Sequence, residues 1–268
     1  SDYDATEISV SEFYLSATQT TTSQYAVFAA SLDLDTDALT QLVTLPASGA
    51  ALTSLLDPST GVAVGTRMNF TAANADAPLF KEAGNAGFGL QKKGNDFIYY
   101  VGYSNNAMAN VTWYGGLAYS VWIGGTLPTE GQWELAARSN ATETYMYAGG
   151  DNLSLVGWSS GSGRVQDVAG KQANGLGFYD MTGNVWEWCA DIINSTTEQP
   201  NASARYPLAS EYAGATASDP IYIGTGSNRV YRGGGWTDAD GILALAFRNN
   251  NTPTRVNNSI GFRAVLVP

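Results

Sequence analysis

The sequence predicts a single α+β domain with few helices and many loops. Residues 7–20 alternate apolar and polar side chains as strands do, and three later segments carry helix patterns. After Arg138 no long helix pattern is evident, and short polar and aromatic stretches alternate with glycines. Because there is no internal repeat, low-complexity linker or clear domain boundary, we expect residues 1–268 to form one domain.

Two of the predicted helices begin with a capping box, in which a threonine and a glutamine three residues later each bind the other's backbone N–H. The boxes are Thr21 with Gln24 and Thr129 with Gln132. The apolar residues that follow share one helical face and should point inward: Tyr25, Phe28 and Leu32 in one helix, and Trp133, Ala136 and Ala137 in the other. A further helix is expected over residues 111–122, and residues 33–108 should form strands and long loops.

The composition argues against several classes of partner. With a formal net charge of −11 and only four lysines, the chain lacks the clustered cations that bind nucleic acid or anionic membranes. No stretch approaches the roughly 20 apolar residues that cross a bilayer, so no membrane insertion is expected, and residues 1–10 show no signal-peptide pattern. Only 14% of residues are charged, and a surface of Ser, Thr, Asn and Gly favours a cell-surface, virion or extracellular protein. The oligomeric state is not indicated.

The absence of histidine and the single cysteine constrain catalysis. Without histidine there is no Ser-His-Asp or Cys-His arrangement and no His-ligated metal. Cys189 has no partner for an intrachain disulfide, and we expect it to be a small buried apolar residue. We therefore expect no catalytic residues and no redox or organic cofactor.

Ordered motifs along the chain carry a family resemblance. The segments EFYLSATQTTTSQYAVF, NVTWYGGLAYSVW, GGTLPTEGQWELAARS, NGLGFYDMTGNVWEWCAD, RVYRGGGW and NNSIGFRAV resemble, in this order, those of the formylglycine-generating-enzyme family. The resemblance covers about residues 8–267. It implies the C-type lectin fold of the formylglycine-generating-enzyme (sulfatase-modifying factor) type, an α+β fold with few helices, short antiparallel strands and much irregular loop.

The enzymes of this family use groups that the chain lacks. Its oxidases carry a pair of cysteines after an RGGS motif, where this chain reads GGGWTDADGILALAFRNNN, and its sulfoxide synthases bind iron through histidines. A non-enzymatic binding protein is therefore expected. Two alternatives stay open: an enzyme of either type, and a lectin of fixed specificity that binds sugar through Ca²⁺, for which Asp238 and Asp240 are the candidate ligands.

The family resemblance implies a structural Ca²⁺ site in the GNVWEW loop. Its oxygen ligands would be Asp180, the backbone carbonyls of Gly183 and Val185, and the carboxylate of Glu187. All-oxygen coordination with two carboxylates suits this ion. In the alternative interpretation, Glu187 accepts hydrogen bonds from the backbone and Asp180 caps a turn.

The C-terminal motifs resemble those of one branch of the family, the variable proteins of diversity-generating retroelements. RGGGW, RNNNTP and NNSIGFR match their pattern, and such systems mutate adenines in a C-terminal repeat to vary a ligand-binding surface. Randomised adenines in asparagine codons never yield Lys, Glu, Gln, Met or Trp. None of these five residue types occurs from Thr237 to Asn258, although all occur elsewhere in the chain.

This resemblance divides the C-terminal segment into constant and variable positions. The constant positions are Arg232, Gly233, Gly234, Trp236, Arg248, Asn250, Pro253, Gly261, Phe262 and Arg263. The variable, ligand-binding positions, within about residues 237–258, are Thr237, Asp238, Asp240, Gly241, Ile242, Ala244, Phe247, Thr254, Val256 and Asn257. The ligand would be a protein or a glycan. Alternation along GILALAF leaves open whether Ile242 and Phe247 or Leu243 and Leu245 face the core, and the constant apolar position at Leu243 favours the second arrangement.

Overall fold

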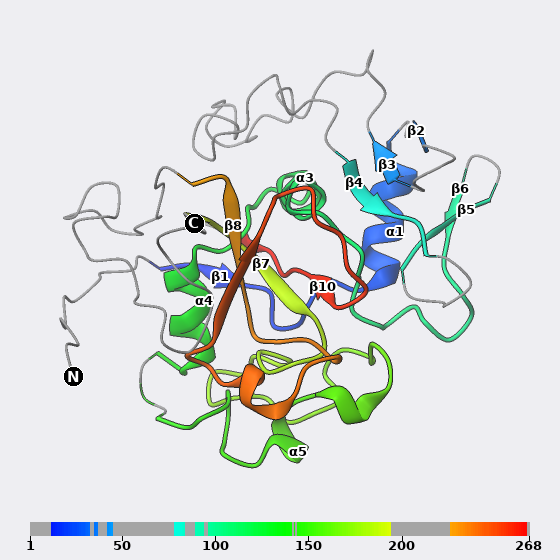
Figure 1. Cartoon of the computed structure of the whole chain (residues 1–268). Coiled ribbons are helices and arrows are strands. Elements are labelled where there is room, and N and C mark those ends of the chain that lie inside the picture. Colours follow the sequence, from blue (N-terminus) through cyan, green and yellow to red (C-terminus); the bar gives the residue numbers. More distant parts are fainter. Residues whose placement is uncertain are drawn as a thin grey trace.

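The computed structural model describes most of the chain in several ranges (Figure 1). These are residues 12–32, 78–83, 89–93, 96–140, 142, 144–193 and 226–266, with strand backbone also at 35–36 and 42–44. Much of the predicted strand-and-loop region 33–108 lies outside the described residues. Within them, no helix has the length and apolar character needed to span a membrane.

A four-stranded sheet of order β10-β7-β8-β9 forms the centre of the molecule. Strand β7 (Trp186–Ile193) is buried along its whole length, because helices or loops cover both of its faces. It pairs antiparallel with β8 (Asn228–Arg232), which pairs antiparallel with β9 (Arg248–Asn251). The short strand β10 (Ile260–Gly261) lies parallel to β7. The GNVWEW motif and the C-terminal segment thus belong to one sheet.

The remaining strands form small antiparallel pairings. β1 (Tyr14–Leu15) pairs with β11 (Val265–Leu266), which joins the first and last described segments of the chain. The other strands are β2 (Asp35–Thr36), β3 (Leu42–Thr44) and β4 (Pro78–Lys81) in one sheet, and β5 (Gln91–Lys93) with β6 (Asp96–Ile98) in a hairpin. The strand-like alternation predicted over 7–20 therefore yields only a two-residue strand among the described residues.

Of the helices in the described residues, two begin at their predicted capping boxes, and the one expected over 111–122 begins at Trp113. The helices are α1 (Thr22–Ala30), α3 (Trp113–Trp122), α4 (Glu130–Ala137) and the short α5 (Leu153–Val156), with 3₁₀ turns η3 (Ser160–Ser162) and η5 (Asp240–Leu243). Both capping boxes are present, and their predicted inward aromatic residues are buried. Figure 1 shows α4 beside β7 and β8, and α1 on the opposite side of the molecule near β4.

An aromatic core joins α1, α3 and the end of the chain. Tyr25 lies 5.5 Å from Phe80, 5.7 Å from Tyr119 and 6.0 Å from Phe262 between ring centroids, and Tyr119 lies 5.4 Å from Phe262. These edge-on and stacked contacts add to the apolar area that the rings bury. The architecture is α+β with few helices and short strands, as the sequence predicts.

Gly115 lies inside α3 because the helix there touches the backbone of β4. A Cβ atom at this position would lie 1.9 Å from the carbonyl oxygen of Leu79 and 2.7 Å from the hydroxyl of Tyr25. We expect Gly115→Ala to lower the free energy of unfolding by about 1–3 kcal/mol, since the overpacking outweighs the better helix propensity of alanine. Urea unfolding would measure it.

Gly131 in α4 provides the matched control, because a Cβ atom there would meet only the Thr129 side chain at 3.9 Å. Gly131→Ala should be neutral or stabilising by up to about 1 kcal/mol. Equal effects of the two substitutions would show that the close contact with Leu79 is not the reason why position 115 requires glycine.

Candidate ligand-binding face

The predicted variable and constant positions differ in their exposure. Thr237, Asp240, Gly241 and Thr254 are exposed, and the other predicted variable residues are half-buried: Asp238, Ile242, Ala244, Phe247, Val256 and Asn257. Of the constant residues, Trp236 and Pro253 are half-buried, and the rest are buried: Arg232, Gly233, Gly234, Arg248, Asn250, Gly261, Phe262 and Arg263. No predicted variable residue lies fully in the core. We call the surface formed by the variable residues the variable face.

The 3₁₀ turn η5 decides which apolar residues of GILALAF face inward. Leu243 and Leu245 are buried, as the constant position favoured, and the arrangement with both of them outward is wrong. Ile242 and Phe247 nevertheless keep part of their surface in contact with the core. Side chains of both sets therefore contact the core, because successive side chains in η5 do not point to alternate sides as they do in a strand.

Two tryptophans hold the variable face together. Trp186 lies 5.0 Å from Tyr231 and 6.1 Å from Phe247 between ring centroids, and its indole N–H donates to Asp238 Oδ2 at 2.7 Å. The indole N–H of Trp236 donates to the carbonyl of Asn258 at 2.9 Å. Residues 236–238 are thereby held against β7 and against the loop at Asn258.

Strand β9 adds two residues that the sequence reasoning missed. Arg248 and Asn250 are buried, whereas Asn249 and Asn251 are half-buried and pair across the strands with Tyr231 and Arg229. Asn249 and Asn251 therefore share the sheet face of Tyr231. The alternation of a strand over RNNN could have identified them.

A buried ion-pair network fixes the base of the variable segment. The Glu130 carboxylate binds Arg232 Nη1 at 2.7 Å and Arg248 Nε at 2.9 Å through Oε1, and Arg248 Nη2 through Oε2. Glu134 Oε2 binds Arg232 Nη2 at 2.7 Å, and this nitrogen also donates to the carbonyl of Leu245. Arg232 and Arg248 flank residues 237–247, so both ends of this part of the variable segment are fastened to α4.

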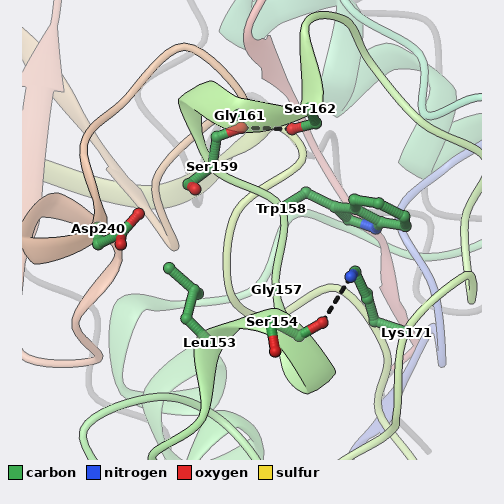
Figure 2. A pocket seen from close by; sticks show the side chains of 9 residues that line it. All are labelled: Leu153, Ser154, Gly157, Trp158, Ser159, Gly161, Ser162, Lys171 and Asp240. Carbon is green, nitrogen blue, oxygen red and sulfur yellow. Dashed lines mark hydrogen bonds between the residues drawn. The ribbon is translucent and has the colours of Figure 1, made fainter.

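A pocket of about 280 Å³ opens beside the variable face (Figure 2). It is lined by Leu153, Ser154, Gly157, Trp158, Ser159, Gly161, Ser162, Lys171 and Asp240. Figure 2 shows Asp240 on one side and the Trp158 and Lys171 side chains on the other. Lys171 Nζ lies 4.2 Å from the centroid of the Trp158 ring and donates to the carbonyl of Ser154 at 2.6 Å.

Two hydrogen bonds to backbone carbonyls of the variable segment also connect it to the residues around the pocket. The N–H of Ser160 donates to the carbonyl of Asp238 at 2.9 Å, and the hydroxyl of Tyr147 donates to the carbonyl of Asp240 at 3.4 Å. Of the residues that line the pocket, Asp240 alone belongs to the predicted variable residues. A ligand in this pocket would therefore contact one predicted variable side chain, Asp240, and otherwise residues outside the variable segment.

In the GNVWEW loop, the predicted calcium ligands surround an amide nitrogen. Gln19 Nε2 lies 3.1 Å from the carbonyl oxygen of Asp180, 3.3 Å from that of Gly183 and 2.9 Å from that of Val185, and it donates to Glu187 Oε1 at 2.9 Å. The structure thus brings the four predicted positions together, although Asp180 contributes its backbone. Gly183 has φ +81°, and a Cβ atom there would lie 2.0 Å from the carbonyl oxygen of Trp158, so the turn requires glycine.

The two carboxylates of this loop have other partners. Glu187 is fully buried and binds Arg263 through two bonds, Nε to Oε2 at 2.7 Å and Nη2 to Oε1 at 2.8 Å, and Oε2 also accepts from the indole N–H of Trp133 at 2.6 Å. Asp180 Oδ2 accepts from the backbone N–H of Ala169 at 2.7 Å. Burial raises the pKa of Asp180, although that bond and Arg263 act in the opposite direction.

Cys189 lies in β7 and is fully buried, which confirms its predicted structural role. Burial raises the pKa of its thiol well above the ordinary value, and Glu130 and Asp191 add to this effect. A thiol in this environment is kept protonated and out of contact with solvent.

The class of protein follows from this architecture: a C-type-lectin-like scaffold of the formylglycine-generating-enzyme type. The family model of the sulfatase-modifying factor enzyme 1-like domain matches residues 2–267, so the chain belongs to this family. Among curated proteins, it is 32% identical over 174 residues to the serine/threonine-protein kinase pkn1 of Chlamydia caviae, which covers 65% of this chain and 26% of that protein.

Two further proteins are similar over different parts of their length. The formylglycine-generating enzyme of Streptomyces coelicolor is 33% identical over 181 residues, which cover 60% of this chain and 53% of the enzyme. The chain therefore matches about a quarter to a half of the length of these two curated relatives. The solved structure of Treponema denticola variable protein 1 matches 100% of this chain and 90% of that chain, with a TM-score of 0.51 and 19% identity, which is a likeness of fold.

Proposed function

We propose that this chain is a non-enzymatic ligand-binding protein, a variable protein of a diversity-generating retroelement, whose variable face binds a protein or a glycan. The proposal rests on the agreement between the predicted class of each position, variable or constant, and its exposure to solvent. Positions assigned as variable from the motif are exposed or half-buried, and most positions assigned as constant are buried. A system that randomises this segment changes the surface and spares the core.

The scaffold beneath the variable face is suited to binding with little ordering cost. Arg232 and Arg248 fasten the two ends of residues 237–247 to α4 through the Glu130 carboxylate, and Trp186 fixes Asp238. A segment that is already ordered loses less conformational entropy when a ligand binds. Half-buried Ile242 and Phe247 supply the apolar anchors that commonly dominate binding energy.

The similarity to Treponema denticola variable protein 1, which extends over the whole chain, supports this function by analogy of fold. The alternative of an enzyme is supported by the 33% identity to a formylglycine-generating enzyme. We disfavour it because the chain has a single cysteine, Cys189, whose thiol is buried, and no histidine.

The alternative of a calcium-dependent lectin would need Asp238 and Asp240 as metal ligands. Asp238 Oδ2 already accepts from the Trp186 indole N–H and from the backbone N–H of Gly235 at 2.9 Å. Asp240 is exposed and lines the pocket, but among the described residues no group of three or more Asp, Glu, Cys or His side chains is arranged to hold a metal ion. This arrangement favours the variable-face hypothesis.

Deep sequencing of the gene in its source population tests the proposal. We expect substitutions to concentrate at adenine-derived positions between codons 237 and 258, with codons for Arg232, Arg248 and Arg263 unchanged. The upstream half of the gene is the internal control. A nearby reverse transcriptase gene with a template copy of residues 232–263 should accompany this pattern, and an invariant 3′ end would refute the proposal.

A further inference from the structure

Four oxygens of the GNVWEW loop point at one atom, the side-chain nitrogen of Gln19, and three of them belong to the expected Ca²⁺ ligands. Three are backbone carbonyl oxygens, of Asp180, Gly183 and Val185, and the fourth is Glu187 Oε1, all within 3.3 Å of Nε2. Gln19 itself is fully buried. The side chain reaches the loop from more than 160 residues earlier in the chain, so its sequence position gives no hint of this contact.

The identity of the Gln19 atom that faces the loop follows from its partners. The other amide atom, Oε1, accepts from Asn184 Nδ2 at 2.9 Å. A reversed amide would place an oxygen against four oxygens and an N–H against an N–H, which leaves every contact repulsive. The nitrogen must therefore face the loop, and its two hydrogens are shared among the four acceptors.

The charge of Glu187 is already balanced without a metal. Glu187 has its negative charge paired with Arg263 through two hydrogen bonds, and both groups are fully buried. Asp180, the second carboxylate of the expected set, directs Oδ2 to the N–H of Ala169. A dication among these oxygens would stand beside the Arg263 guanidinium, and the one carboxylate oxygen of Asp180 and Glu187 without a hydrogen-bond partner is the buried Oδ1 of Asp180.

The distances between Gln19 Nε2 and the four loop oxygens also fit an amide donor. The contacts to Nε2 are 2.9–3.3 Å long, which is the range of N–H···O hydrogen bonds, whereas Ca²⁺ requires oxygens at about 2.3–2.6 Å. The residues present do not fit the expected ion in this arrangement.

We infer that the Gln19 amide replaces the calcium ion implied by the family, so that the GNVWEW loop of this protein is closed without a metal. The amide supplies two polarised hydrogens to the convergent oxygens, and Arg263 supplies the positive charge for Glu187. Trp186, which lies between Val185 and Glu187, is held in place by the same loop. The support of the variable face is therefore independent of calcium.

Thermal unfolding of the whole chain tests this inference directly. We expect the same melting temperature in excess Ca²⁺ and in a chelator such as EDTA. A rise of several degrees in Ca²⁺ that the chelator reverses would overturn the inference. This measurement needs no ligand, so its outcome is independent of the proposed binding function.

Substitution of Gln19 tests the role of the amide. Gln19→Ala should lower the melting temperature by roughly 4–10 °C in the absence of metal, because several buried acceptors lose their donor. Gln172, whose side chain is exposed, provides the control, and Gln172→Ala should change little. Equal effects of the two substitutions would contradict the inference.

Gln19→Glu keeps the size of the side chain and removes the N–H donors. This variant should be less stable than the natural protein in the chelator, and it should gain a Ca²⁺-dependent rise in melting temperature, since its oxygens then need a cation. A Gln19→Glu variant as stable as the natural protein in the chelator would show that the amide N–H does not satisfy the loop. If Gln19→Glu fails to fold, the comparison of the natural protein in Ca²⁺ and chelator still decides.

Discussion

Glu130→Gln is expected to lower the free energy of unfolding by about 5 kcal/mol, at the upper end of the range for breaking a buried ion pair. The reason is that one carboxylate serves two buried arginines, Arg232 and Arg248, at 2.7 and 2.9 Å. The glutamine amide cannot supply negative charge to either of them, and both arginines stay too deep for water to replace the lost partner. Urea unfolding of the two proteins measures the difference.

Glu134 provides the control, since it binds Arg232 from the edge of the same helix with 20% of its side chain exposed. Glu134→Gln should cost about 1 kcal/mol or less, because solvent screens and replaces part of this interaction. Hydrogen exchange should also rise selectively within residues 237–247 in Glu130→Gln. If the two variants lose equal stability, the central role of the Glu130 carboxylate is wrong.

Glu187→Gln should cost about 3–5 kcal/mol for a related reason. It leaves the Arg263 guanidinium fully buried without its carboxylate, and a glutamine amide cannot accept at both positions that Glu187 offers to Arg263, Trp133 and Gln19. The expected loss is large although Glu187 touches no part of the variable face. Equilibrium unfolding in urea, followed by circular dichroism, would measure it.

A double-mutant cycle with Arg263→Met separates the ion pair from general packing. The double variant should be more stable than the sum of the two single losses predicts, because neither charge is then left alone. Strict additivity would mean that Glu187 and Arg263 stabilise the fold independently, which contradicts the geometry of their two short contacts.

The local signals of the sequence predicted the local structure well. The capping boxes at Thr21 and Thr129 lie where their helices begin, because a cap depends on residues three positions apart. The family motifs likewise identified the fold, and most positions that they mark as constant are buried. These features depend on neighbours in the chain or on patterns that stand in a fixed order.

The contacts that cross long stretches of sequence could not be predicted in this way. Glu130 meets Arg248 over a separation of 118 residues, and Gln19 meets Glu187 over 168. Each contact depends on how α4, β7 and β9 pack, which no local pattern specifies. The carbonyls of Gly183 and Val185 and the Glu187 carboxylate lie together, but the Asp180 side chain binds the N–H of Ala169 instead. The Gln19 amide at their centre was not predicted, because no local pattern distinguishes Gln19 from the other polar residues of the chain.

The hydrogen bond between Trp186 and Asp238 limits the repertoire that a randomised segment can offer. The tryptophan N–H is largely buried and needs an acceptor, and the side chain at 238 supplies it. Among the residues that mutated asparagine codons can encode, Asp, Asn and Ser keep an acceptor at this point, while Val, Ile or Phe remove it. If the segment is randomised as we propose, substitutions at position 238 that remove the acceptor should destabilise the fold, so fewer variants are usable than the mutated codons can encode.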